Sequence, residues 1–243
     1  MINKKKILLC AIALLVALAV IGGLLYLFLG YLPEQRKKEE WARMVREYRD
    51  NKTAIYVEEN NKYAPFEVDI AFIGDSLTDG YDVKSYYPEY TVSNRGIGGD
   101  TTYDLFARLD VSIYQLEPKV VVMLIGANNF KTMLNNYEDI IIGIRNNLPD
   151  TKLVVCSLTS MGGEHWGKNN EIAAYNNVYV KALAEKHGCS FVDLYTPLLN
   201  LETGEIYENY TTDGGHLTAD GYAVLTSVIK PVIDEILRKD ASN

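Results

Sequence analysis

The 243-residue sequence predicts an α/β fold, with a five-stranded parallel sheet between helices and an N-terminal transmembrane helix before it. Three observations lead to this prediction. Strand and helix patterns alternate from about residue 67 to the end of the chain. One strand segment, 119–125, is apolar after its first residue, which is typical of burial on both faces of a sheet. An unbroken uncharged stretch fills most of the first 30 residues.

The uncharged stretch runs from Ile7 to Leu29. As a helix it would be roughly 35 Å long, enough to cross a bilayer with some tilt. The apolar part of a signal peptide is shorter and ends at a cleavage site with small residues, and this stretch has no such site. We therefore expect an uncleaved signal anchor, with a cleaved signal peptide as the alternative. A buried helix of a soluble domain is disfavoured because no face of the stretch is polar.

The distribution of basic residues bears on the orientation of this anchor. Three lysines, Lys4 to Lys6, precede it, and six basic residues follow it: Arg36, Lys37, Lys38, Arg43, Arg46 and Arg49. A count of these charges favours a cytoplasmic domain, but long domains translocate largely regardless of charge, and the lysines adjoin the apolar stretch directly. We expect a single-pass protein of the cell membrane whose main domain is extracytoplasmic.

The segment after the anchor predicts a helix over 34–50. Trp41, Met44, Val45 and Tyr48 form one apolar stripe, and the basic faces suit either anionic lipid headgroups or packing on the main domain. Residues 51–63 are polar and without pattern. The predicted organisation is an anchor at 1–30, a juxtamembrane helix and linker at 31–66, and one domain at 67–243.

The charge of the chain limits its partners. Residues 1–50 carry nine basic and five acidic residues, so the remainder has 24 − 9 = 15 basic and 32 − 5 = 27 acidic residues, a net charge of −12. Such an acidic body argues against a nucleic-acid partner. The spacing of the three cysteines matches no zinc pattern, and with only three histidines any metal site would have to be rich in carboxylates. No metal site is predicted.

The predicted domain alternates strands and helices. The strands are expected at 68–73, 90–93, 119–125, 151–158 and 190–194, and the helices at about 101–115, 136–147, 169–187 and 218–238. Alternation of this kind implies right-handed crossovers, a parallel sheet and helices on both of its faces. Ligands of such folds bind beyond the carboxyl ends of the strands, so the residues that follow each strand are the candidates for a site.

Three strand ends carry residues suited to acyl transfer. Ser76 follows the first strand on a tight turn into a helix, where it is either an exposed nucleophile or part of a helix cap. The glycine-rich segment 94–101 follows the second strand and could supply an oxyanion N–H or cradle a phosphate. Asn128 follows the third strand and is either a polar site residue or a turn former.

Two histidine-containing segments complete the candidates. Asp213 lies three residues before His216, a spacing that lets the carboxylate bond Nδ1–H and leave Nε2 free as a base. His165 and Trp166 lie in the loop after the fourth strand, where they either line a substrate entrance or form a plain surface loop.

Taken together, these segments resemble the GDSL esterases and lipases, also called SGNH hydrolases. Gly74-Asp75-Ser76-Leu77 matches the nucleophile block, and Asn94 through Thr102 matches the second block, with its oxyanion glycine at Gly99. Gly126-Ala127-Asn128 matches the third block, although Asn129 replaces the usual aspartate. Asp213 and His216 match the last block. Four blocks in order are far more specific than any one of them.

The resemblance implies a three-layer α/β/α flavodoxin-like fold and a serine esterase without metal or organic cofactor. Ser76 would attack the acyl carbon, His216 would take its proton and Asp213 would orient the imidazole. The N–H groups of Ser76 and Gly99 and the amide of Asn128 would form the oxyanion hole. We expect the substrate pocket to include Asp75, Leu77, Asn129, His165 and Trp166.

The resemblance implies a carboxylic ester as substrate, which could be a small molecule, a lipid or a glycan. The membrane segment at 7–29 and the acidic body favour esters of the cell envelope, such as O-acetylated glycans. Tyr81, Tyr86, Tyr87 and Tyr103 could stack on a sugar or fill the core. Acyl transfer to cell-wall glycan is an alternative, and a non-catalytic anchored binding module is another, against which the intact residue set argues.

Overall fold

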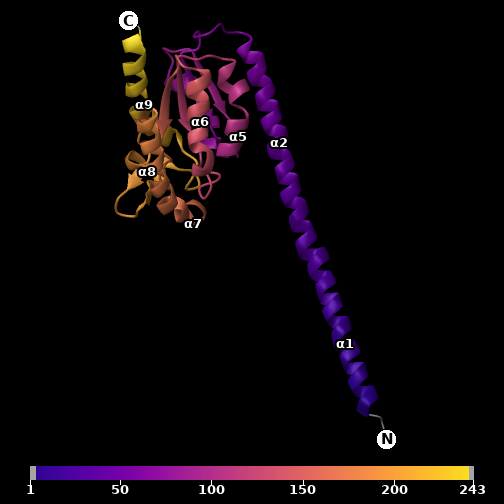
Figure 1. Ribbon diagram of the computed structural model, residues 1–243. Helices are drawn as coiled ribbons and strands as arrows, with labels where there is room; N and C mark the ends of the chain where they lie inside the picture. The colour runs from indigo at the N-terminus through magenta and orange to yellow at the C-terminus, as the bar shows by residue number, and fades with distance from the viewer. Residues whose placement is uncertain (1–3, 241–243) are drawn as a thin grey trace. The chain divides into compact units, whose positions relative to one another are not determined.

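The computed structural model describes residues 4–240 and divides into two compact units, one ending at Tyr48 and the other beginning at Arg49. Figure 1 shows the chain and labels α1, α2 and α5 to α9. The first unit contains α1 (Lys4–Leu25), a π-helical turn (Tyr26–Tyr31) and the start of α2 (Leu32–Asn60). The second unit contains the end of α2 and the whole sheet. The predicted boundaries at residues 30 and 66 remain predictions, and neither coincides with this division.

By length and composition, the helical part of the first unit could cross a membrane. Its most apolar 18 residues are not buried against any other part of the described chain. Many of its large apolar side chains, such as those of Leu14, Leu18 and Ile21, are more than half exposed. A helix that is apolar on all sides is stable when lipid or protein covers it. This helix is therefore a candidate membrane span.

The second unit is built on a parallel sheet whose strand order is β2-β1-β3-β4-β5. The strands are β1 (Ile70–Gly74), β2 (Val92–Gly96), β3 (Val120–Leu124), β4 (Lys152–Cys156) and β5 (Ser190–Val192). From β1 the chain moves outward to β2 and then returns to β3 on the other side of β1. Ligands of open α/β sheets bind at this kind of reversal, beyond the carboxyl ends of the strands. The predicted fold class and all five strands are confirmed.

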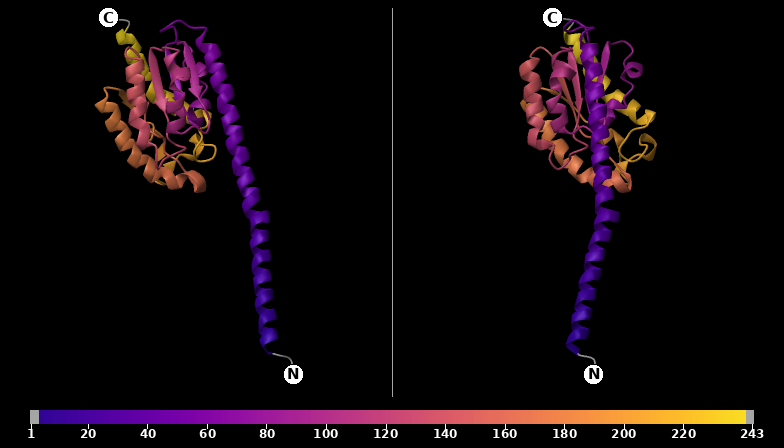
Figure 2. Two further views of the ribbon diagram at one scale, coloured as in Figure 1. Left: turned by 45° about the vertical axis from the view of Figure 1, so that its right-hand side comes forward. Right: turned by 90° about the vertical axis from the view of Figure 1, so that its right-hand side faces the viewer.

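Helices cover both faces of the sheet, as the two views in Figure 2 show. The helices are α3 (Ser76–Asp79), α4 (Val83–Tyr86), α5 (Thr102–Ala107), α6 (Leu134–Asn147), α7 (Gly163–Trp166), α8 (Asn170–Lys186) and α9 (Ala219–Asp240). Alternate strand residues point to opposite faces. In β1, Ala71 and Ile73 pack with α5, α6 and α8, while Ile70 and Phe72 pack with α3, α4 and α9.

Several element boundaries differ from the prediction. The α2 helix continues to Asn60 instead of ending at residue 50. Its last turns belong to the second unit, where polar contacts of Arg49 and Lys52 hold them, so no apolar stripe marks them in the sequence. Strand β2 extends through Asn94, Arg95 and Gly96, which were predicted as loop. The helix expected over 101–115 is interrupted, with a separate π-helical turn at Asp110–Tyr114.

Short elements that the sequence did not predict complete the unit. An antiparallel pair joins β6 (Leu199–Asn200) to β7 (Glu205–Ile206), and 3₁₀ turns lie at Gly167–Asn169, Thr196–Leu198 and Glu208–Tyr210. They belong to the loops that follow β4 and β5. These loops lead the chain to the segment that holds His216.

Candidate active site

Ser76 lies at the turn between β1 and α3, and the local sequence enforces a tight turn there. A Cβ on Gly74 would overlap the carbonyl oxygen of Leu124 on the neighbouring strand, so only glycine fits. The buried side chain of Asp75 caps α3 by accepting the N–H of Leu77 at 3.1 Å. The Oγ of Ser76 lies 3.0 Å from Nε2 of His216, a residue near the C-terminal end of the second unit.

The segment that carries His216 also holds the partner of its other ring nitrogen. Oδ2 of Asp213 lies 2.8 Å from Nδ1 of His216. Oδ1 of the same carboxylate accepts the backbone N–H groups of Gly215 at 2.9 Å and of His216 at 2.7 Å. Asp213 is thus fixed by its own loop, with one oxygen left for the imidazole.

These contacts favour the ionised form of Asp213. Burial by itself would raise the pKa of this carboxyl. The hydrogen bonds from the backbone and imidazole of His216 and from the backbone of Gly215 outweigh that effect and hold the pKa well below its usual range. An ionised Asp213 fixes the proton of the neutral imidazole on Nδ1, so Nε2 can accept a hydrogen bond from Ser76.

Gly99 and Asn128 lie on the loops after β2 and β3. Gly99 has a φ of +84°, a left-handed conformation that favours glycine. Asn128 donates one N–H of its amide to the backbone carbonyl of Asp100 at 2.9 Å. An asparagine amide carries two N–H donors, so this contact ties Asn128 to the Gly99–Asp100 segment and uses only one of them.

A small hollow brings several of these residues together. Its lining consists of Ser76, Leu77, Ala127, Asn128, Thr159, Met161, Trp166, Gly215 and His216. The centre of a water molecule can occupy about 10 Å³ inside it, so the hollow has room for roughly one water. The ring of Trp166 stands edge-on to the imidazole of His216, with 5.8 Å between the ring centroids.

Not all predicted pocket residues line this hollow. Leu77 and Trp166 do, whereas the side chain of Asp75 is buried beneath the turn. Burial raises the pKa of Asp75 to about 6, against the backbone N–H groups of Leu77, Ala127 and Gly126, which act to lower it. The Asp75 carboxyl therefore links the turn that carries Ser76 to the loop after β3, through the backbone of Gly126 and Ala127.

Asn129 and His165 also lie outside the lining, and Gly99 is not part of it either. The amide of Asn129 accepts the N–H of Thr102 at 3.2 Å and donates to the Thr102 hydroxyl at 2.9 Å. His165 contacts Trp166 edge-on, with 5.0 Å between ring centroids. Both residues support neighbours of the hollow.

Four lining residues were not predicted from the sequence: Ala127, Thr159, Met161 and Gly215. Thr159 and Met161 are buried in the loop after β4, and no motif marks them. Gly215 did have a signal, because it lies between Asp213 and His216. A Cβ there would come within 2.5 Å of the Trp166 ring, so glycine lets the indole pack against this segment.

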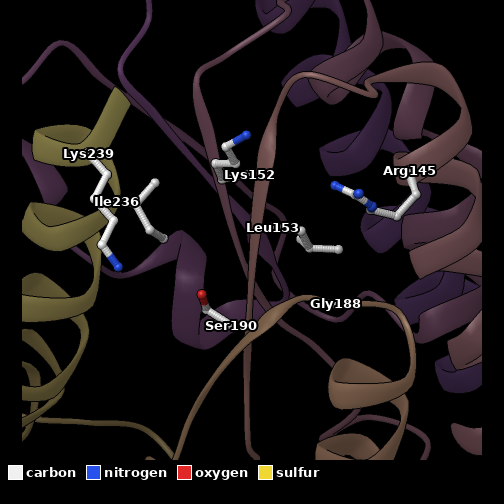
Figure 3. Close-up of a pocket in the computed structure, with 7 residues that line it drawn as sticks. All are labelled: Arg145, Lys152, Leu153, Gly188, Ser190, Ile236 and Lys239. Carbon is white, nitrogen blue, oxygen red and sulfur yellow. The ribbon is translucent and has the colours of Figure 1, made fainter. Parts of the chain in front are cut away.

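A second hollow lies away from these residues and is larger, at about 150 Å³. Figure 3 shows its lining: Arg145, Lys152, Leu153, Gly188, Ser190, Ile236 and Lys239. Lys152 and Ser190 begin β4 and β5, so this hollow is at the amino-terminal edge of the sheet. Its serine has neither a histidine nor a carboxylate within the lining, so the histidine and carboxylate that accompany Ser76 have no counterpart there.

Within residues 4–240, no three His, Cys, Asp or Glu residues are grouped so as to hold a metal ion.

Comparison with known proteins identifies relatives of the second unit. Residues 72–224 match the model of the GDSL-like lipase/acylhydrolase family. The rat (Rattus norvegicus) platelet-activating factor acetylhydrolase IB subunit alpha2 is 26 % identical over 182 residues, which cover 71 % of this chain and 79 % of the relative.

Solved structures share the fold. A Streptococcus pneumoniae protein described as a platelet activating factor superposes with a TM-score of 0.73 at 26 % identity, covering 82 % of this chain and 99 % of that one. The acetylxylan esterase Axe2 of Geobacillus stearothermophilus superposes with a TM-score of 0.58 at 21 % identity, covering 70 % and 95 % of the two chains.

Proposed function

The chain belongs to the GDSL-like lipase/acylhydrolase family and is an ester hydrolase, and on this premise we propose that it cleaves esters of small acyl groups, acetyl above all, through Ser76, His216 and Asp213. The observation that carries the proposal is a continuous pair of contacts. Ser76 Oγ is 3.0 Å from His216 Nε2, and His216 Nδ1 is 2.8 Å from Asp213 Oδ2. Both distances lie within hydrogen-bonding reach, as nucleophile activation requires.

In the first half of the reaction, Ser76 Oγ attacks the acyl carbon as its proton moves to Nε2 of His216. The new imidazolium is stabilised by the ionised carboxylate of Asp213. When the tetrahedral intermediate collapses, the bond to the alcohol oxygen breaks and His216 returns the proton to that oxygen. The alcohol leaves and the acyl group stays on Ser76.

In the second half, water attacks the acyl-enzyme. His216 takes a proton from the water, and the second tetrahedral intermediate expels Ser76 Oγ, which recovers the proton from the imidazolium. The carboxylic acid leaves and the resting enzyme is restored, so the cycle needs no cofactor.

The negative oxygen of both intermediates needs donors. Ser76 is the first residue of α3, and the first N–H groups of a helix have no partner within the helix. This N–H, the N–H of Gly99 and the second N–H of the Asn128 amide are the proposed donors. Donors of this kind interact most strongly with charge that develops in the transition state.

The size of the hollow supports a small acyl group. Room for roughly one water suits the methyl of an acetyl group, and Trp166 and Met161 belong to the wall that a longer chain would meet. The rat relative is named an acetylhydrolase, which agrees with this reading. Together with the candidate membrane span, an extracytoplasmic location would give access to O-acetylated glycans or lipid esters of the envelope.

The proposal is tested by steady-state hydrolysis with the full-length chain in detergent, on esters of one alcohol with acetyl, butyryl and octanoyl groups. We expect kcat/KM to be highest for acetyl and to fall by at least tenfold for butyryl, since a pocket discriminates each extra methylene by about 10-fold or more. Ser76→Ala and His216→Ala should each lower kcat by about 10⁴ or more, and the double variant should lose little more. Additive losses, or equal rates on octanoyl esters, would contradict the proposal.

A further inference from the structure

The last turns of α2 make polar contacts with the segment that carries Gly99. Arg49, Lys52 and Tyr56 are spaced i, i+3 and i+7, so they share one face of the helix. All three belong to the second unit. Arg49 and Tyr56 contact the segment between the end of β2 and α5 directly, and Lys52 contacts it through the side chain of Asp79. No catalytic motif includes these helix residues.

Arg49 reaches the most buried charge of this region. Its Nε donates to Oδ1 of Asp100 at 2.8 Å, and its Nη1 lies 3.0 Å from Oδ1 of Asp104. The side chain of Asp100 has no exposed surface, whereas that of Arg49 is 22 % exposed. Asp104 completes a capping box with Thr101 at the start of α5, so Arg49 holds both ends of the Asp100–Asp104 turn.

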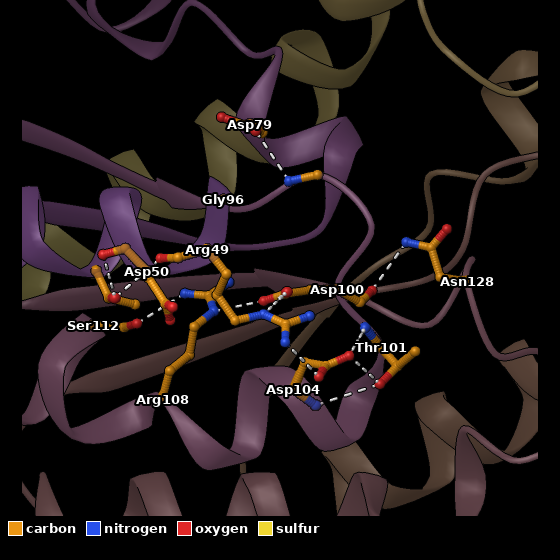
Figure 4. A network of polar contacts seen from close by, with 12 residues as sticks. Arg49, Asp50, Asp79, Gly96, Asp100, Thr101, Asp104, Arg108, Ser112 and Asn128 are labelled. Atoms are coloured by element: carbon orange, nitrogen blue, oxygen red, sulfur yellow. Dashed lines mark hydrogen bonds and ion pairs between the residues drawn. The ribbon is translucent and has the colours of Figure 1, made fainter. Parts of the chain in front are cut away.

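Asp100 also contacts Arg108 and Asn128, and Figure 4 shows these contacts. Its Oδ2 accepts Nε of Arg108 at 2.6 Å, and Arg108 donates in turn to the carbonyl oxygen of Gly74, two residues before Ser76, at 2.9 Å. The carbonyl oxygen of Asp100 accepts the Asn128 amide. One residue next to Gly99 is thus linked to Arg49, to the end of β1 and to Asn128.

Two further contacts bind α2 to the same segment. Lys52 Nζ lies 2.7 Å from Oδ1 of Asp79, and Oδ2 of Asp79 accepts the N–H of Gly98 at 3.0 Å. The hydroxyl of Tyr56 donates to the carbonyl oxygen of Gly96 at 2.8 Å. The residues on both sides of Gly99 are therefore fixed by the helix, directly or through one carboxylate.

Gly99 has no side chain through which it could be held. Its φ of +84° lies in the left-handed region, which glycine adopts as readily as other conformations. An oxyanion donor works only if it is held in place before the reaction. We infer that Arg49 is a positioning residue of the hydrolase, and that through Asp100 it fixes the Gly99 N–H and the Asn128 amide toward the oxyanion. This inference rests on the proposed function.

The test compares Arg49→Ala with Arg46→Ala in the full-length chain. Arg46 is an exposed arginine of the same helix, so its variant is the matched control. We expect Arg49→Ala to lower kcat by about 10-fold to 100-fold at nearly constant KM, because misplaced donors weaken an interaction made mainly in the transition state. Arg46→Ala should retain the wild-type kcat and KM.

Two more variants separate positioning from a loss of folding. Arg49→Lys keeps the charge but not the two-pronged geometry, so its kcat should lie between those of Arg49→Ala and wild type. Lys52→Met removes the link through Asp79 and should also lower kcat at constant KM. Thermal unfolding of each variant fixes the assay temperature below every transition, and Lys52→Met carries the test should Arg49→Ala not fold.

The inference is overturned if Arg49→Ala and Lys52→Met behave as Arg46→Ala does, or if they raise KM and leave kcat unchanged. Failure of the proposed function looks different. In that case wild type does not hydrolyse the acetyl ester, or Ser76→Ala still does, and the inference falls with it.

Discussion

Two neighbouring asparagines show how the structure separates residues that are adjacent in sequence. Asn128 lines the hollow beside Ser76, whereas Asn129 holds the backbone and hydroxyl of Thr102. The Asn129 amide is directed to the hydroxyl groups of Thr102 and Thr132 and away from the oxyanion. Asn128 is therefore the one expected to act on the reaction and Asn129 the one expected to act on the loop.

We expect Asn128→Ala to lower kcat by about 10²–10³ with little change in KM, as for other oxyanion donors. Asn129→Ala should lower the thermal midpoint more than it lowers kcat. Steady-state kinetics and thermal unfolding of the two variants provide the comparison. A larger kcat loss for Asn129→Ala, with Asn128→Ala near wild type, would reverse the assignment.

The buried Asp75 carboxyl predicts a pH dependence of stability. Its pKa is about 6 in the folded chain against an ordinary value of 3.8, so between these values the folded state keeps a proton that the unfolded state releases. Stability supplied by this group is full below pH 3.8 and is lost as the pH rises to about 6, a change of at most about 3 kcal/mol. Asp75→Asn cannot ionise and should lack this loss.

The measurement is the free energy of unfolding of wild type and of Asp75→Asn at pH 4, 5, 6 and 7. We expect the variant to gain stability relative to wild type as the pH rises. A difference that does not change with pH would show that Asp75 titrates normally.

Among individual residues, the sequence predicted the site residues that belong to motifs and missed those that do not. Tyr81 and Tyr87 were candidates for sugar stacking or core, and the structure buries both. Arg95 is fully buried and donates to Ser93 and to the carbonyl of Tyr56, a placement that no local pattern indicates. Thr159 and Met161 likewise enter the hollow through tertiary packing alone.

At the scale of elements, the short helix α7 controls the size of the hollow. It brings Trp166 against Gly215 and edge-on to His216. Because the indole is part of the wall, its removal should enlarge the space for the acyl group without touching Ser76.

Trp166→Ala should therefore raise the ratio of kcat/KM for butyryl to that for acetyl esters by about tenfold or more, since one or two methylenes then fit. The exposed Trp41 supplies the control, and Trp41→Ala should leave the ratio unchanged. An unchanged ratio in Trp166→Ala would place the acyl group elsewhere.

Elements with a regular apolar pattern were predictable, and those held by polar contacts were not. Strands β1, β3 and β4 have apolar runs that match the buried faces of the sheet. The end of α2 has no apolar run. Ion pairs with Asp100 and Asp79 hold it, and such pairs produce no regular pattern of apolar residues in the sequence. The β6–β7 pair is too short to carry a pattern.

At the scale of the whole molecule, the sequence predicted an anchor followed by an α/β hydrolase. The fold and the family follow from local signals that agree, since strand ends and motif blocks fall at the same edge of one sheet. Membrane insertion and orientation stay predictions, because they depend on a bilayer and on charges that flank both ends of the apolar stretch.

The orientation is tested by adding protease to intact cells that express the full-length chain. An extracytoplasmic hydrolase unit should be digested while a cytoplasmic marker protein remains intact. Protection of the unit until the membrane is broken would place it in the cytoplasm and make the basic residues after the anchor the deciding signal.

Ser76, activated by His216, is the proposed nucleophile. Reaction of the full-length chain with a fluorophosphonate, followed by mass measurement of the intact protein and of its peptides, tests this most directly. We expect one adduct per chain, on the peptide that contains Ser76, none on Ser76→Ala and a much slower reaction of His216→Ala. An adduct on Ser76→Ala at the wild-type rate, carried by another serine, would show that Ser76 is not the nucleophile.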